Sequence, residues 1–292
     1  MSFLFNRITT LRVFDEGDDT GFLFNNDFRI KFSIEKTSEI NANVGKISIY
    51  NLKNSSIGLL ENNSARAVLE SGYRGIPRSI GVNGSDTFIF ENPIIEILAT
   101  GNIDKVATNR VGSDTITTFE IRDGGENLQS ATLEQSFPPG STTTQIINAL
   151  SGALGTTRGV FRGIQEQVFS NGVSISGRIR DTLEDITSKI NTEFSVQDNE
   201  LQIIPVGGNT GESAIEVQPE TGLIGSPVRV VNNTNGEPGG VEFTTLLNPA
   251  YRPGRIVQLT SQFITGTFTV QKVTFTGDNQ LGSENIAKVQ AK

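Results

Sequence analysis

Apolar and polar residues alternate along much of this chain, and that alternation predicts strands. Between residues 28 and 35 every second side chain is apolar, namely Phe28, Ile30, Phe32 and Ile34. A period of two indicates a strand with one buried face. The same pattern predicts further strands in the first 123 residues, at about 46–51, 66–72, 94–105 and 116–123.

The middle of the chain has a different texture. Residues 142–154 and 180–191 carry apolar side chains at the spacing of an amphipathic helix. Two short apolar runs then flank Asp198–Glu200, which favours a hairpin. Helices combined with short strands predict a small α+β unit. We therefore expect a mixed domain over residues 124–206.

Hydroxyl side chains stand where two helices are predicted to begin. Ser141 or Thr142 can cap the helix that begins near residue 142. Ser55 or Ser56 can cap a short helix that ends at Leu60. Such hydroxyls accept hydrogen bonds from the free backbone N–H groups of the first helical turn.

Beyond the glycine-rich loop at residues 207–211, only strands are predicted. Asn83–Gly84 in the first part of the chain and Asn235–Gly236 in the last favour type I′ hairpin turns, because these residue types tolerate positive φ angles. The strands of the last part are expected at 213–217, 228–231, 240–247, 255–260, 266–276 and 285–292.

The predicted fold is mainly β with an α+β insert. We expect an N-terminal antiparallel β-barrel over residues 1–123 and the insert over residues 124–206. A second β-barrel is expected over residues 207–292, and it can borrow strands from other segments. A chain of 292 residues is long enough for two or three domains.

Composition removes several classes of function. The chain has no Cys and no His, so neither a Ser-His-Asp nor a Cys-His nucleophilic site can be built. Zinc sites with thiolate or imidazole ligands are excluded for the same reason. A net charge of −8 argues against a surface that binds the phosphate backbone of a nucleic acid. The first residues lack the features of a signal peptide and no apolar run could span a bilayer, so we expect no membrane insertion.

Carboxylates are the remaining candidates for chemistry. Asp15–Asp19 lacks the ligand spacing of a calcium loop, and we interpret it as a solvated acidic turn. Glu184 and Asp185 are adjacent on a predicted helix, where neighbouring side chains diverge by about 100° and cannot cooperate. Glu166 or Glu193 could each serve a lytic enzyme that needs a single glutamate, and that alternative stays open.

No nucleotide site is expected either. Gly152–Gly155 lacks both the Lys-Ser/Thr pair of a phosphate-binding loop and the spacing of a dinucleotide fingerprint. We therefore expect a protein that is not an enzyme. We assign no catalytic, cofactor-binding or metal-binding residue, and no cofactor.

One stretch of about thirty-five residues carries a resemblance to a known family. It runs from Glu220–Pro227, which contains TGLIGSP, through Leu246–Pro249 (LLNP) to Arg252–Gly254 (RPG). Each piece alone is ordinary turn chemistry. In this order, the three resemble the baseplate hub proteins of bacteriophage tails and related contractile injection machines.

Elements of the same family can be followed from about residue 28 to residue 280. The segment before residue 100 departs from it, because residues 76–93 are longer than expected and the usual Phe before Thr100 is replaced. The elements that resemble the family are Ile47–Leu52 (IYNL), Val68–Gly75 (GYRG), Thr100–Ile103 with Arg110, Thr117–Gly124 (DG) and Thr276–Asp278 (GD). For each of them we prefer a role in maintaining the fold.

The resemblance implies a specific assembly. Hubs of this family are trimers in which each chain contributes two tube-like β-barrel domains, so six barrels form a pseudo-sixfold ring. That ring adapts the sixfold tail tube to the threefold spike and leaves a channel for DNA. The implied partners are two further copies of the chain, the tail tube or tube-initiator protein, the central spike, the tape measure protein and surrounding baseplate proteins. DNA would be met only in transit, and the implied location is the virion tail baseplate, assembled in the host cytoplasm.

Two other functions are weighed against this one. A distal tail protein or another tail ring or tube component would share the barrel lineage, although the mixed unit at residues 124–206 argues against a bare tube subunit. A cell-wall hydrolase or glycan-binding module belongs to a different class. Within the hub hypothesis, three chains carry a formal charge of −24, and an acidic lumen would repel the DNA backbone.

Overall fold

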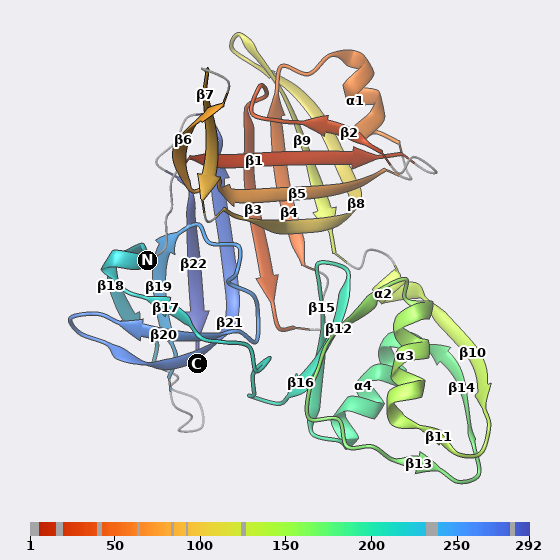
Figure 1. The fold of residues 1–292 in the computed structure, drawn as a ribbon. Coiled ribbons are helices and arrows are strands. Elements are labelled where there is room, and N and C mark those ends of the chain that lie inside the picture. Colours follow the sequence, from red (N-terminus) through yellow and green to blue (C-terminus); the bar gives the residue numbers. More distant parts are fainter. Residues whose placement is uncertain are drawn as a thin grey trace.

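Antiparallel strands dominate the computed structural model of this chain (Figure 1). The fold class predicted from the sequence, mainly β with an α+β insert, is confirmed. Side chains are described except between residues 76 and 92 and at Asn127. The residues that the structure describes are 6–15, 20–39, 43–62, 65–82, 85–91, 93–123, 127–231, 239–280 and 284–292.

The chain begins with strands and one short helix. These elements are β1 (Arg7–Phe14), β2 (Phe22–Phe24), β3 (Ile30–Thr37), β4 (Val44–Tyr50), α1 (Asn54–Leu60), β5 (Arg66–Tyr73), β6 (Ile76–Val82), β7 (Ser85–Glu91), β8 (Ile94–Val111) and β9 (Asp114–Arg122).

The middle of the chain contains the two longest helices and short strands. Its elements are α2 (Asn127–Ser130), β10 (Thr132–Phe137), β11 (Ser141–Thr142), α3 (Thr143–Ala153), β12 (Thr157–Phe161), β13 (Val168–Phe169), β14 (Val173–Arg178), α4 (Ile179–Lys189), β15 (Thr192–Gln197) and β16 (Glu200–Pro205).

The last part returns to strands, with a single 3₁₀ turn among its described residues. Its elements are β17 (Ile215–Val217), η1 (Pro219–Thr221), β18 (Leu223–Arg229), β19 (Val241–Leu246), β20 (Ile256–Thr260), β21 (Thr265–Asp278) and β22 (Ile286–Ala291).

The first and last parts of the chain share one sheet. Among the described residues, its continuous strand order is β18-β19-β22-β21-β3-β4-β9-β8-β5-β1-β2. In addition, β20 pairs with β21, and β17 pairs with β20. The joint between the two parts is the antiparallel pair β3–β21, which runs from Lys31 opposite Asp278 to Thr37 opposite Lys272. Backbone hydrogen bonds therefore connect segments that are more than 200 residues apart.

Two sets of five strands within this sheet have the same topology. We define the N-terminal unit as β3, β4, β5, β8 and β9, and the C-terminal unit as β18 to β22. The N-terminal unit pairs in the order β3-β4-β9-β8-β5, and the C-terminal unit pairs in the order β18-β19-β22-β21-β20. Every pair in both units is antiparallel. Taken in chain order, the two units match strand for strand.

Each unit is bent by one long strand. The first half of β8 pairs with β5 and its second half with β9, and a register shift lies between Asp104 and Ala107. In the same way, the first part of β21 pairs with β20 and its second part pairs with β22, and a register shift lies between Val270 and Lys272. Irregularities of this kind increase strand twist and bending. As a result, β1 and β5 run across β3 and β4 in Figure 1.

The β strands and the insert have separate apolar cores. One cluster joins buried residues of both units, for example Phe32 and Phe119 with Phe275. A second cluster lies within the middle part and includes Ile147 of α3 and Leu183 of α4. Each core is what the alternation in strands and the helical spacing in α3 and α4 predict. The domain limits at residues 123 and 206 stay a prediction.

Several local predictions can be compared with the structure. Thr142 caps α3 with a capping box, as predicted. The cap predicted for α1 is wrong, because Ser55 and Ser56 lie inside the helix and the N-cap position is Lys53, which makes no side-chain cap hydrogen bond. β18 begins earlier than predicted, at Leu223.

Other predictions fell short or cannot be compared. β1 and β2 were not predicted at all, although β1 supplies buried Leu11 and Val13. The turn pairs Asn83–Gly84 and Asn235–Gly236 lie outside the described residues. In the part of the chain that is described, no helix is long and apolar enough to cross a membrane.

Candidate functional site: the junction between the insert and the sheet

The tip of one hairpin of the insert contacts the sheet. β15 and β16 are joined by Asp198 and Asn199, whose φ angles are 55° and 65°. Two successive positive φ angles are typical of a type I′ turn, the connection that fits the twist of a two-residue hairpin. The hairpin predicted around Asp198–Glu200 is therefore present. Its tip presents two backbone N–H groups to the sheet.

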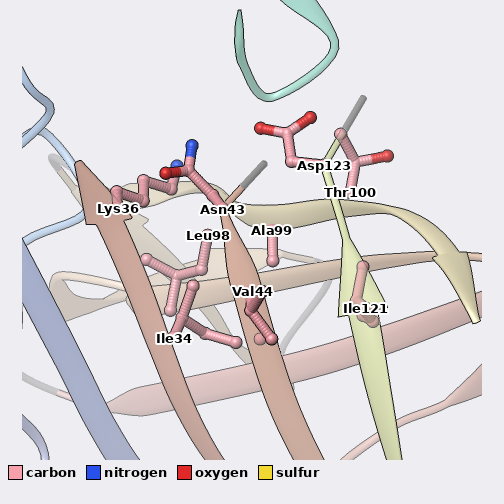
Figure 2. Close-up of a pocket in the computed structure, with 10 residues that line it drawn as sticks. Ile34, Lys36, Asn43, Val44, Leu98, Ala99, Thr100, Ile121 and Asp123 are labelled. Atoms are coloured by element: carbon pink, nitrogen blue, oxygen red, sulfur yellow. The ribbon is translucent and has the colours of Figure 1, made fainter. Parts of the chain in front are cut away.

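Asp123 receives both of those N–H groups. It follows the last residue of β9, and its carboxylate accepts hydrogen bonds from the backbone nitrogens of Asp198 (2.5 Å) and Asn199 (2.8 Å). Figure 2 shows this carboxylate directed toward the turn above it. Hydrogen bonds to a charged acceptor are stronger than those between neutral groups. Asp123 thus holds the hairpin at the end of β9.

A buried ion pair reinforces the same contact. Lys36, near the end of β3, places its Nζ 2.6 Å from both carboxylate oxygens of Asp198. The two side chains are only 1% and 5% exposed. The Arg252 guanidinium approaches the same carboxylate at 3.5 Å, from the turn before β20. One hairpin tip is therefore held by cations from the first and the last part of the chain.

Two amide side chains complete the junction. Asn43, just before β4, donates to the Val196 carbonyl and to the Gln197 side chain, each at 3.0 Å. Gln197 in turn donates to the Thr37 carbonyl at 2.8 Å. Because Asn43 and Gln197 are buried, these hydrogen bonds offset the cost of removing their polar atoms from water. They also fix the position of β15 relative to β3 and β4.

The junction changes the protonation of Asp123. Burial, together with the nearby charge of Asp198, raises the pKa of Asp123 to about 6. Lys36 and the two backbone N–H groups act in the opposite direction but do not outweigh burial. Desolvation disfavours the charged form of a carboxyl group. Attachment of the insert is therefore linked to protonation in the mildly acidic range.

The space around the junction is too small for a ligand. A cavity of about 10 Å³ lies between the ends of β3, β4 and β9, lined by Ile34, Leu98 and Asp123 among others (Figure 2). That volume is at the lower limit for one water molecule. A second cavity, of about 100 Å³, lies beside Gln202 and Arg255. Small-molecule sites usually need about 300–1,000 Å³. The geometry of the junction supports mechanical attachment.

The carboxylates weighed in the sequence do not come together here. Glu166 is exposed, and it accepts hydrogen bonds from the backbone and hydroxyl of Thr144. Glu193 is half-buried, and burial raises its pKa. Glu184 and Asp185 are both exposed on α4. Among the described residues, no group of three acidic side chains could hold a metal ion.

The acidic segment at residues 15–19 can be followed only at its first residue. Asp15 accepts a hydrogen bond from the Asn62 side chain. Residues 16–19 lie outside the described part of the chain.

Sequence reasoning missed the junction, although one signal was present. Lys36 continues the row of Ile30, Phe32 and Ile34 on the inner face of β3, which is an unusual place for a lysine. In the sequence, Asp123 stood out only as part of a family element and as the point where the predicted strands give way to the mixed unit. Neither position indicated its partner, because Asp198 lies 75 residues beyond Asp123.

Comparison with known proteins places the fold. No protein-family model matches the sequence, and no curated protein sequence is significantly similar to it. The 43 kDa tail protein of prophage MuSo2 from Shewanella oneidensis is similar in structure, with a TM-score of 0.64 at 10% identity over 98% of this chain and 97% of that one. This chain has the fold of a tail protein.

Two further structures support the same fold. The tail protein from Neisseria meningitidis gives a TM-score of 0.60 at 10% identity, over 99% of this chain and 97% of that one. An E. coli component of the type VI secretion system, described as structurally similar to the T4 phage tail proteins gp27 and gp5, gives 0.53 at 10% identity. That match covers 96% of this chain and 76% of the E. coli chain. The resemblance to the hub family is thus confirmed for the fold.

Two glycines of the family elements found in the sequence are required by the backbone. Gly72 and Gly101 have φ angles of 152° and 154°; Gly72 lies on β5 opposite the start of β8, and Gly101 lies on β8 next to the point where β9 replaces β5 as its partner. A Cβ at Gly72 would lie 1.8 Å from the Ile94 carbonyl oxygen, and one at Gly101 would lie 1.9 Å from that of Arg122. Only glycine allows such a close approach. Both glycines therefore permit close packing of neighbouring backbones, and Gly101 does so next to the bend of β8.

Proposed function

We propose that this protein is the structural hub of a phage tail baseplate. In this role three copies form a pseudo-sixfold ring, in which the N-terminal and C-terminal units occupy alternate positions. The ring joins a sixfold tail tube on one face to a threefold spike on the other, and DNA passes through its lumen. The partners are the tube or tube-initiator protein, the spike, the tape measure protein and surrounding baseplate proteins.

One observation carries this proposal most directly. The two units have the same strand order within one chain, β3-β4-β9-β8-β5 and β18-β19-β22-β21-β20. A chain with two equivalent units can occupy two positions of a sixfold ring, so three chains are enough to complete it. The full-length likeness to tail proteins supports the same function. So does the likeness to a secretion-system component that is described as similar to gp27 and gp5.

The mass of the purified protein tests the proposal. We expect an assembly of three times the 31.5 kDa of one chain, measured by native mass spectrometry or sedimentation. Imaging of the ring should then show threefold symmetry with six similar lobes around a channel. A ring of six chains would instead favour a distal tail or tube component, and a species that is monomeric at every concentration would contradict the hub.

An enzyme of the cell wall is the alternative from another class. It is supported only by the open possibility that Glu166 or Glu193 acts alone. A zymogram with intact cell walls separates the two functions. We expect no clearing, and clearing that disappears in Glu166→Gln or Glu193→Gln would overturn the hub as the complete function.

The acidic-lumen hypothesis belongs to the same proposal. Three chains carry a formal charge of −24, which would keep a DNA backbone from adhering to the wall of the channel. A structure of the assembled ring tests it directly. A lumen lined mainly by Lys and Arg would contradict it.

A further inference from the structure

Within the chain, the two units are joined once, through β3 and β21. The corresponding strands of the opposite units do not pair with each other among the described residues. Within the chain, the outer edge of β3 pairs with the second half of β21. β3 is the first strand of the N-terminal unit, and β21 is the fourth strand of the C-terminal unit. The joint therefore connects a first strand with a fourth strand, in antiparallel sense.

The corresponding strands of the opposite units are β18 and β8. β18 is the first strand of the C-terminal unit, and in the described part of the chain it pairs only with β19. β8 is the fourth strand of the N-terminal unit, and among the described residues its second half pairs only with β9. No described strand of the same chain therefore covers the two edges that correspond to the two sides of the β3–β21 joint. They belong to the same chain but to different units.

Apolar side chains are exposed on and just after β18, as expected for a strand that another chain covers in an assembly. In β18, Val228 is 62% exposed and Ile224 is 43% exposed, and just after the strand Val230 is 42% and Val231 is 76% exposed. An exposed edge strand with apolar side chains is a template for pairing with another strand. Proteins that stay unpaired usually place charges or proline along such an edge. In β18 the only charged residue is Arg229, and Pro227 lies in its register shift; the second half of β8 carries Asp104, Lys105 and Arg110, so this criterion applies to β18 alone.

The second half of β8 offers an edge of matching length. From Asp104 to Val111 every side chain is exposed except Val106, which is half-buried. Val111 itself is 60% exposed. The register shifts at Asp104/Ala107 and Val270/Lys272 occupy the same place in the two units. When β8 and β21 are aligned at these register shifts, residues 107–111 of β8 correspond to residues 272–276 of β21. Residues 272–276 pair with β3.

We propose that β18 of one copy pairs in antiparallel sense with the second half of β8 of the next copy. The pairing repeats, between chains, the β3–β21 joint that each chain already makes within itself. It places Val228–Val231 opposite residues 108–111 of the neighbour, with Val228 facing Val111. This inference rests on the proposed ring and specifies which strands close it.

The pairing uses two different edges of each chain, so it is a head-to-tail contact. Head-to-tail contacts either close into a ring or continue as a filament. If the joint between chains has the geometry of the joint within a chain, successive units are related by one repeated rotation. A ring of six units then contains three chains.

Disulfide trapping tests the contact without interference, because the sequence contains no cysteine. Residues directly opposite each other in an antiparallel pair have Cα atoms about 4.5–5.5 Å apart, within the range of a disulfide. We would combine Val111→Cys with Val228→Cys in one chain and with Val230→Cys in another. The matched control is Ser33→Cys with Thr276→Cys, two residues that face each other in the internal joint.

We expect the control to form a bond within one chain and at least one test pair to form bonds between chains. The linked species should reach three chains and no more. If the protein is trimeric but neither test pair forms a bond while the control does, this contact is wrong and the hub function stands. If the protein is a single chain at every concentration, both proposals fail.

Charge on the β18 edge supplies a second test. Val228→Lys combined with Val230→Lys should weaken self-association at least tenfold without changing the circular dichroism spectrum, because both side chains are already exposed. Val111→Lys on β8 should have a similar effect. Val168→Lys is the matched control, since Val168 is 59% exposed on the insert. Trimers of the β18 variant as stable as those of the control would overturn the contact.

Discussion

The two β units are joined to each other in one way, and the insert is attached to them in another. The N-terminal and C-terminal units are joined by a ladder of backbone hydrogen bonds between β3 and β21, over one shared apolar core. The insert has its own core and is held at its hairpin tip by Asp123, Lys36 and Arg252. A ladder fixes register along its whole length, whereas a polar contact depends on a few side chains and their charge. We therefore expect the first joint to be permanent and the second to respond to its surroundings.

The shared core should show the largest effect of a single substitution. Phe275 of β21 is fully buried opposite Ile34 of β3, so Phe275→Ala should lower the free energy of unfolding by about 3–5 kcal/mol. Phe263 is the matched control, because it is 69% exposed in the turn before β21, and its replacement by Ala should change stability by less than about 0.5 kcal/mol.

Denaturant unfolding followed by circular dichroism measures both variants. If the two units share one core, Phe275→Ala should destabilise the strands of the N-terminal unit as well. Amide hydrogen exchange at β4 and β9 reports this. Unchanged protection in those strands would show that the two units unfold separately.

The two attachments also differ in how far they could be predicted from sequence. Alternation located β3, which buries every second side chain, and β21, which does so from Val273 to Gly277. It could not indicate that they pair, since periodicity says which face is buried and nothing about the neighbouring strand. β1 was missed because polar Arg7 and Thr9 share a face with Leu11 and Val13, and β2 was missed because its three apolar residues show no alternation.

The junction was harder still to predict. A buried lysine such as Lys36 can be recognised on the inner face of a strand, but its partner depends on the tertiary fold. Asp198 was predicted only as a turn residue. Its role follows from the position of the whole insert, which no local pattern encodes.

Removing the buried cation should be the largest single effect at the junction. Lys36→Met leaves the Asp198 carboxylate buried without its closest partner, and breaking a buried pair typically costs about 3–5 kcal/mol. We expect the lower end, roughly 3 kcal/mol, because Arg252 stays close to the same carboxylate.

The double variant Lys36→Met with Asp198→Asn isolates the charge. It should recover part of the loss, because no unpaired charge then remains buried. Calorimetry of the three proteins measures the difference. A double variant no more stable than Lys36→Met would mean that packing, and not charge, holds the hairpin.

Protonation of Asp123 should produce a smaller effect that depends on pH. Its pKa in the folded protein is raised to about 6 from an ordinary value of 3.8, so protonation favours the folded state. The stabilising contribution is complete below about pH 4 and is lost as pH rises through about 6. Relative to Asp123→Asn, the wild type should therefore lose roughly 2–3 kcal/mol between pH 4 and pH 6.

Thermal unfolding at several pH values measures this difference. Glu184→Gln is the control, since Glu184 is exposed on α4 and is not among the groups that act on Asp123. It should follow the wild type at every pH. Parallel curves for wild type and Asp123→Asn would contradict the linkage between protonation and the junction.

The smallest expected effect separates the stability of the insert from that of the sheet. Thr142 caps α3 by accepting the Gln145 backbone N–H, so Thr142→Ala should destabilise the insert by about 1 kcal/mol. Ser55→Ala in α1 is the matched substitution: Ser55 is exposed inside the helix, and the change should be neutral or slightly stabilising. Hydrogen exchange of α3 and α4, compared with that of β3 and β21, measures where the loss occurs. Because the insert has its own core, we expect faster exchange in α3 and α4 alone, and an equal loss of protection in β3 would show that insert and sheet unfold as one unit.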